Sequence, residues 1–158
     1  MGWWSTTIMG GDTPLDFKDT FYGMAGIEPS YSDNPTSKEE LPGLVESLTE
    51  RFIHDDGIRM KEILNKWGCG KPGSDYFNDH LSIGYQVLAV MYITSGAKLD
   101  ESLKNLMLKW IPEDAWSNKD DERRGHITNL TESLKNYDGS EKISITSEGL
   151  FEVMLKNN

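Results

Sequence analysis

A histidine beside two carboxylates is the first group in this sequence that could carry out chemistry. His54, Asp55 and Asp56 are consecutive, and such residues bind divalent metals in hydrolytic sites. Sites of this kind need a further histidine from an earlier helix, but none of the three histidines precedes residue 54. Glu46, Glu50 and His54 are spaced by four, which predicts one solvated helix face. We therefore expect no metal site. The alternative interpretation, a small metal-dependent hydrolase or nucleotide-binding enzyme, would use Asp12, Asp16, His54, Asp55 and His80.

Residues 68–73 (GCGKPG) are similar to a phosphate-binding loop only in part. That motif needs Ser or Thr after its lysine, but Pro72 follows Lys71, and Asn65 stands where the first glycine is required. Cys69 is the only cysteine, so neither an internal disulfide nor a thiolate metal site is possible. No histidine lies close to it in sequence to activate the thiol. We expect no catalytic residue and no cofactor.

The charge of the chain restricts its partners. The formal net charge is −10, whereas nucleic-acid binding depends on clustered Lys and Arg. We therefore expect no direct nucleic-acid binding, and a protein partner with a basic surface. A DNA-mimicking surface is disfavoured, because acidic and basic residues alternate, as in residues 113–124. No apolar run is long enough to span a membrane and no signal peptide is evident, which predicts a cytoplasmic protein without membrane association.

The partner-binding residues should be exposed acids next to exposed rings, because aromatic anchors supply binding energy and charges raise the association rate. Glu113, Asp114 and Trp116 follow Pro112 in what we expect to be a loop between helices. Tyr31, in the loop over residues 29–35, is the second candidate. These four residues form the predicted partner surface.

Hydrophobic spacing predicts a mainly α fold, a compact bundle of about six to seven helices in a single domain over residues 1–158. Thr13, Asp100 and Asn118 are the expected N-caps of three of these helices. The helices are expected over residues 14–25, about 42–56, 60–67, about 75–95, 101–111, 119–137 and from 147 onward. The alternating residues 142–146 predict one short strand.

The N-terminal residues 2–17 combine two tryptophans with a Gly-Gly-Asp turn and a Leu-Asp-Phe sequence. The matching positions are Gly2, Trp3 or Trp4, Asp12, Asp16 and Phe17. This pattern resembles the start of the uncharacterised bacterial family called domain of unknown function 4259. The chain departs from that pattern in having Trp3-Trp4-Ser5 in place of x-Trp-Gly, and Gly11-Asp12 in place of an acidic pair. The resemblance implies a compact helical domain of bacteria and their mobile elements, and no particular activity. We expect Trp3 or Trp4 to pack between helices and hold the N-terminus in place. The alternative is an exposed aromatic contact for a partner.

Together these observations predict a non-enzymatic, acidic protein-binding domain. An immunity-type protein or a phage-encoded inhibitor of a host defence system has this character. The metal-dependent hydrolase or nucleotide-binding enzyme is the alternative, and it requires carboxylates and histidines to converge in space.

Overall fold

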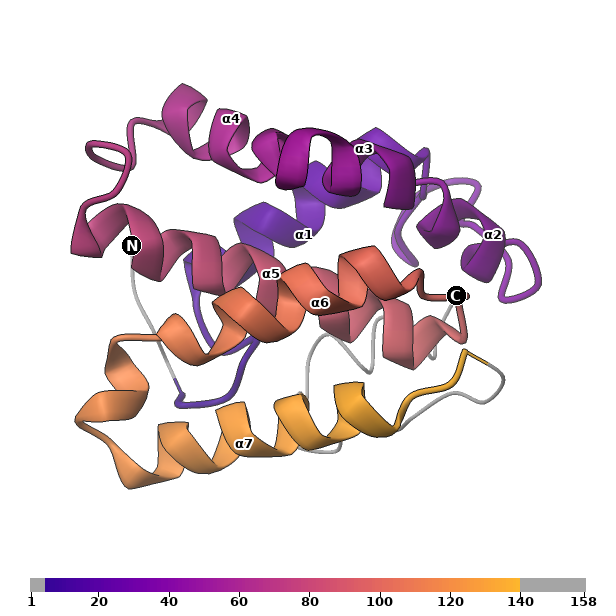
Figure 1. Cartoon of the computed structure of the whole chain (residues 1–158). Helices are drawn as coiled ribbons and strands as arrows, with labels where there is room; N and C mark the ends of the chain where they lie inside the picture. Colours follow the sequence, from indigo (N-terminus) through magenta and orange to yellow (C-terminus); the bar gives the residue numbers. More distant parts are fainter. Residues whose placement is uncertain (1–4, 140–158) are drawn as a thin grey trace.

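The structure, a computed structural model, describes residues 5–139, and the elements in that range are α-helices and short 3-10 turns joined by loops. This confirms the mainly α prediction (Figure 1). The α-helices are α1 (Asp12–Ala25), α2 (Leu41–Glu46), α3 (Thr49–Ile53), α4 (Ile58–Trp67), α5 (Asp75–Ser95), α6 (Glu101–Trp110) and α7 (Asp121–Asn136). Short 3-10 turns are η1 (His54–Asp56), η2 (Ile111–Glu113) and η3 (Trp116–Asn118). The predicted strand over 142–146, the helix from 147 and the packing of Trp3 and Trp4 lie outside the described residues.

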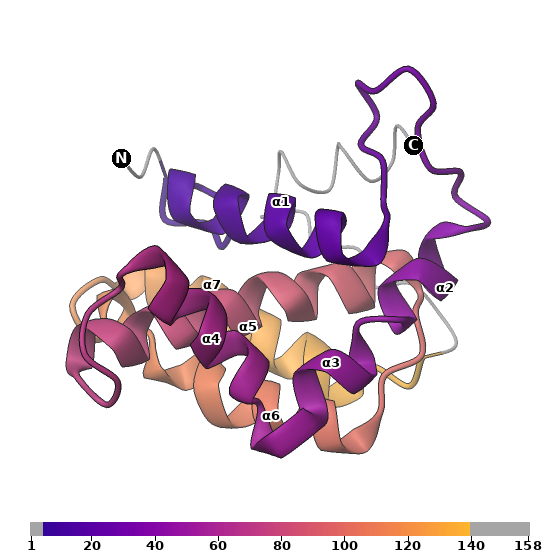
Figure 2. The same cartoon turned by 90° about the horizontal axis from the view of Figure 1, so that it is seen from above.

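Helix α5 is the centre of the bundle, and α1, α2, α4, α6 and α7 all contact it. It is apolar on most of its surface, so it is buried over almost its whole length. Seen from above, α1 lies on one side of α5 and α6 lies on the other, while α7 passes behind α5 (Figure 2). Gly84 permits the close crossing, because a Cβ there would lie 2.7 Å from Met60 Sδ and 3.0 Å from Phe17 Cε1.

The predicted helix ends are confirmed where a side chain or a left-handed glycine defines them. Gly26 and Gly96 end α1 and α5 at φ values of 72° and 81°. Asp100 caps α6, because its carboxylate accepts a hydrogen bond from the Ser102 backbone N–H at 2.8 Å. The Asn118 cap was wrong: α7 is capped by Asp120, which accepts from the Arg123 N–H at 2.9 Å.

Two other helix predictions also need correction. Helix α1 begins at Asp12 after an extended Gly11, so Thr13 lies inside the helix and is not its cap. The continuous helix expected from residue 42 is split into α2 and α3. The Ser47 hydroxyl donates to the Leu44 carbonyl at 2.6 Å at the break, a bond that competes with the helical ladder.

The segment before α1 folds back onto α7. Ile8 and Met9 are buried in the common core, and Arg123 donates to the carbonyls of Thr6 and Thr7 at 3.1 and 2.9 Å. The N-terminal segment is therefore held by a side chain from the last described helix. None of the helices in residues 5–139 has both the length and the apolar character needed to cross a membrane.

Candidate binding cleft

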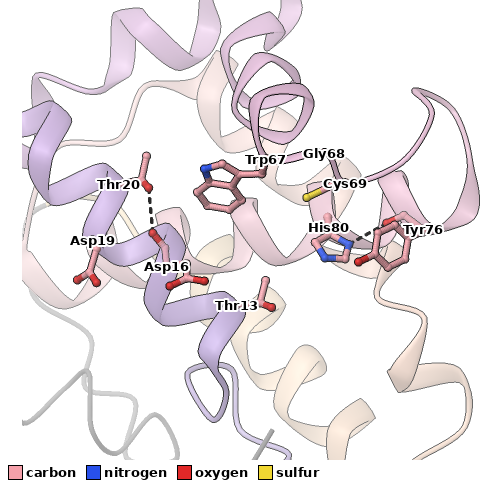
Figure 3. A pocket seen from close by; sticks show the side chains of 9 residues that line it. All are labelled: Thr13, Asp16, Asp19, Thr20, Trp67, Gly68, Cys69, Tyr76 and His80. Carbon is pink, nitrogen blue, oxygen red and sulfur yellow. Dashed lines mark hydrogen bonds between the residues drawn. The ribbon is translucent and has the colours of Figure 1, made fainter. Parts of the chain in front are cut away.

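An open cleft of about 530 Å³ lies where α1 passes the end of α4 and the start of α5 (Figure 3). Its polar wall comes from α1, and its aromatic walls come from α4 and α5. The lining residues are Thr13, Asp16, Asp19, Thr20, Trp67, Gly68, Cys69, Tyr76 and His80. None of them is Lys or Arg, so the cleft is acidic and aromatic.

Local sequence signals position these walls. Gly68, in the left-handed conformation at φ 72°, ends α4 and turns the chain so that Cys69 is buried beside the cleft. Ser74 starts α5 by accepting a hydrogen bond from the Phe77 N–H at 3.2 Å. Tyr76 and His80 then follow four residues apart on one face of α5, which brings both rings to the cleft.

His80 presents a hydrogen-bond acceptor to the cleft. Its ring is 8% exposed, and Nδ1 lies 2.9 Å from the backbone oxygen of Tyr76. A carbonyl oxygen can only accept, so Nδ1 carries the proton and Nε2 of the neutral ring carries the lone pair. No other residue of the described chain bonds to Nε2. In Figure 3 the imidazole and Trp67 lie on the same side of the cleft, facing the side chains of α1.

The two carboxylates of α1 differ in their partners. Asp19 forms an ion pair with Lys18 at 3.0 Å. No hydrogen bond or ion pair engages the Asp16 carboxylate within residues 5–139; the hydroxyl of Thr20 bonds instead to the Asp16 backbone oxygen at 2.9 Å (Figure 3). Asp16 therefore supplies an uncompensated negative charge to the cleft.

The aromatic side chains of the cleft are unusually open to solvent for their size. Trp67 is 37% exposed and Tyr76 is 55% exposed. One side of the Trp67 indole packs on Phe17 at a centroid distance of 4.7 Å, and the Tyr76 ring lies 4.3 Å from the ring of His80. Packing on one side and solvent on the other orients both rings as ready contact surfaces.

Cys69 contributes an uncharged thiol. Burial raises the pKa of Cys69 above its ordinary value, so the thiol stays protonated at neutral pH. The thiolate is the nucleophilic form of cysteine, and the cleft therefore does not contain an activated sulfur nucleophile.

The residues of the alternative metal site are not brought together as a group. Asp16 and His80 line the same cleft. His54 and Asp55 pair with each other at 3.2 Å on the exposed η1 turn, and neither residue lines the cleft. Asp12 does not line the cleft. Among residues 5–139, no group of three His, Cys, Asp or Glu side chains could hold a metal ion.

A second pocket of about 350 Å³ shares Thr13, Tyr76 and His80 with the cleft and leads to Asp114 and Arg123. Asp114, which we expected to be an exposed acid of the partner surface, is buried instead. Its side chain is 1% exposed and pairs with Arg123 at 2.6 Å. Arg123 is itself fully buried, so Asp114 is the counter-ion that makes its burial tolerable.

Buried amides and hydroxyls extend this ion pair into a network. Gln86 donates to Asp114 and to Ser82, both at 2.9 Å, and its oxygen accepts from Arg123 at 2.9 Å. Ser82 in turn donates to the Ile111 carbonyl at 2.8 Å. The network connects α5, the η2 turn and α7, and its role is structural.

The two aspartates near this network have pKa values that are shifted in opposite directions. Burial alone would raise the pKa of Asp114, but the hydrogen bonds and charge of Arg123, with bonds from Gln86 and Ser117, outweigh it and leave the pKa lowered. Burial also acts on Asp79, and there it raises the pKa, despite the hydrogen bond from the Ala115 N–H at 2.8 Å. Asp114 is therefore firmly ionised, while the charge on Asp79 is disfavoured.

The other three residues of the predicted partner surface differ in their exposure to solvent. Tyr31 is 75% exposed and Glu113 is exposed. Trp116 is half-buried, with its ring 5.2 Å from the guanidinium carbon of Arg123. Tyr31, Glu113 and Trp116 stay predictions as partner contacts.

Comparison with protein-family models, with curated proteins and with solved structures gives no match to this chain. The resemblance to the domain of unknown function 4259 family stays a prediction. Function must accordingly be inferred from the geometry of the cleft.

Proposed function

We propose that this chain is an acidic protein-binding domain whose partner presents a basic surface, and that the cleft at α1, α4 and α5 is where that surface docks. The observation that carries this proposal is the lining of the cleft: two carboxylates and two solvent-exposed rings, with no Lys or Arg. Rings at the centre of an interface supply most of its binding energy, and charges steer the encounter.

The charge of the whole chain supports the same partner. At −10, the protein attracts basic surfaces over distances longer than a contact. The neutral thiol of Cys69 and the lack of a metal-binding group among residues 5–139 give the cleft no evident hydrolytic machinery. An immunity-type protein or a phage-encoded inhibitor is the class of protein that fits these features.

Site-specific photocrosslinking tests the proposal. A benzophenone amino acid replacing Tyr76 places the crosslinker at the rim of the cleft, and the same replacement at Tyr31 samples a separate exposed loop. The partner crosslinked at position 76 is then purified and its association rate is measured by biolayer interferometry against ionic strength. We expect a basic partner whose association rate falls as salt rises.

A charge-reversal pair provides the control. Asp16→Lys should slow association and weaken binding, while Glu39→Lys makes the same change of charge at an exposed residue that does not line the cleft. Equal effects of the two variants would mean that only net charge matters. Crosslinking at position 31 and not at 76 would move the docking surface to the Tyr31 loop and overturn the proposal.

A further inference from the structure

Two hydrogen-bond acceptors of the cleft have no partner among the described residues, and they lie in the same lining as the Trp67 indole and the Tyr76 hydroxyl. The Asp16 carboxylate has no partner within the described chain, and the Nε2 lone pair of His80 has none either. His80 is 8% exposed as a residue, and its unbonded Nε2 is not an enclosed atom, so this acceptor is open to a donor that enters the cleft. A ligand that satisfies both atoms must donate hydrogen bonds and carry positive charge.

A metal ion does not meet this description. A metal needs three or more ligands around one point, and no such group exists among residues 5–139. Asp16 lies on α1 and His80 on α5, on different walls of a cleft of about 530 Å³. The cation must therefore be extended, with donors pointing in several directions.

The aromatic walls of the cleft favour one kind of organic cation over another. Trp67 and Tyr76 offer partly exposed rings at the cleft. A planar guanidinium stacks on such rings and has five N–H donors in its plane, whereas an ammonium is a compact, strongly hydrated point charge. The acceptors of Asp16 and His80 lie on different walls, next to aromatic rings. This arrangement suits a guanidinium group better than an ammonium group.

We infer that the cleft binds the guanidinium group of one arginine side chain of the partner, with Asp16 and His80 Nε2 as its acceptors and Trp67 as its stacking surface. This inference rests on the proposed function, since it names the group by which a basic partner is recognised. His80 can accept at Nε2 when Nδ1 carries the proton, and the bond from Nδ1 to the Tyr76 carbonyl favours that tautomer.

Peptide titrations followed by ¹H–¹⁵N NMR of the full chain test the inference without a known partner. The probes are acetyl-Gly-Arg-Gly-amide, its lysine counterpart and its citrulline counterpart, which keeps the planar shape of arginine but has no charge. The arginine peptide should shift the Trp67 indole N–H and the Gly68 and Cys69 amides. We expect the citrulline peptide to bind about tenfold or more weakly, because it loses the charge-assisted bonds, and the lysine peptide to fall between them.

Matched variants assign the acceptors. Asp16→Asn should weaken arginine-peptide binding by about tenfold, while Asp75→Asn removes the same charge from an exposed residue outside the cleft and should leave it nearly unchanged. His80→Asn retains a donor for the Tyr76 carbonyl but removes the Nε2 acceptor, so it should weaken binding too. Unchanged amide shifts elsewhere in each variant establish that it is folded.

Three results would overturn the inference: equal affinities for the arginine and citrulline peptides, peptide-induced shifts confined to residues outside the cleft, or equal weakening by Asp16→Asn and Asp75→Asn. The proposed function fails separately. If the arginine peptide binds as expected but Asp16→Lys does not affect the crosslinked partner, the cleft recognises arginine without being the docking site. If Asp16→Lys weakens binding of the partner but the three peptides bind with equal affinity, the proposed docking site is supported. The inference that it binds a single arginine is then wrong.

Discussion

Arg123 binds both carboxylate oxygens of Asp114 inside the protein, with Nη2 2.6 Å from Oδ2 and Nε 3.3 Å from Oδ1. Its remaining donors go to Gln86 and to the carbonyls of Thr6 and Thr7. A buried ion pair is tolerated when every polar atom is bonded in this way, and it becomes costly when one partner is removed.

Removing the arginine should therefore destabilise the fold strongly. Arg123→Met leaves the Asp114 carboxylate buried without its counter-ion and should lower the free energy of unfolding by about 3–5 kcal/mol, measured by urea denaturation. The control is Arg59→Met, which breaks an exposed pair with Glu62 at 3.0 Å and should cost less than about 1 kcal/mol. Similar losses in the two variants would show that the buried pair has no special weight.

The lowered pKa of Asp114 predicts a loss of stability in acid. For a carboxyl whose folded pKa lies below its unfolded value of about 3.9, the stabilisation is present above that value and is lost as the pH falls through the folded pKa. Asp114→Asn should lower stability at neutral pH and flatten the acid limb of a plot of unfolding free energy against pH. If the acid limb is unchanged in Asp114→Asn, the loss of stability in acid does not come from protonation of Asp114.

Asp79 should behave in the opposite sense. Its pKa is raised, mainly by burial and also by the nearby charge of Asp114, so stability is greatest below its unfolded pKa and falls as the pH rises through the folded pKa. Asp79→Asn keeps an oxygen for the Ala115 N–H and removes the ionisation. We expect a higher free energy of unfolding than wild type at neutral pH, and a value close to wild type in acid. A less stable variant at neutral pH would show that the charge itself is useful.

Two glycine-to-alanine substitutions should change the free energy of unfolding in opposite directions. At Gly84 an added methyl meets Met60 and Phe17 at the crossing of α5 with α4 and α1, so Gly84→Ala should destabilise by about 1–3 kcal/mol. Gly23 lies in α1 with nothing within 4 Å of an added Cβ, and Gly23→Ala should stabilise by about 0.5–1 kcal/mol. Thermal or urea denaturation of both variants checks the helix crossing directly.

The thiol of Cys69 offers a chemical test of the cleft wall. Because burial raises its pKa, the folded protein should react with Ellman's reagent much more slowly than the urea-unfolded chain at the same pH. The arginine peptide should slow the reaction further, and the citrulline peptide should not. Rapid reaction of the folded protein would mean that the wall is open in solution.

The helices were predictable because their signals are local. The long apolar run over residues 75–95 and the ends at Gly26, Gly68 and Gly96 correspond to α5 and to observed helix ends. Caps were less certain, because Asn118 and Asp120 are both good N-cap residues and only the observed bond to the Arg123 N–H decides between them.

The cleft was predictable only in part, because it is made by residues far apart in sequence. Asp16 and His80 were candidates, but as metal ligands, and Trp67 was expected only as the last residue of a helix over residues 60–67. Asp114 was assigned to the surface because a loop after a proline is normally solvated. One signal was available: Arg123 precedes Ile127, Leu130 and Leu134 on the buried stripe of α7, and an arginine there needs a buried counter-ion.

The hydrogen bonds from Arg123 to the first described residues also set an order of assembly. Thr6 and Arg123 are 117 positions apart, so during synthesis the carbonyls of Thr6 and Thr7 have to wait until α7 has been made. Contacts with such large sequence separation form slowly, because a long loop has to close before they are gained. The segment that leads into helix α1 is thus made before the side chain that holds it, and its attachment waits for α7.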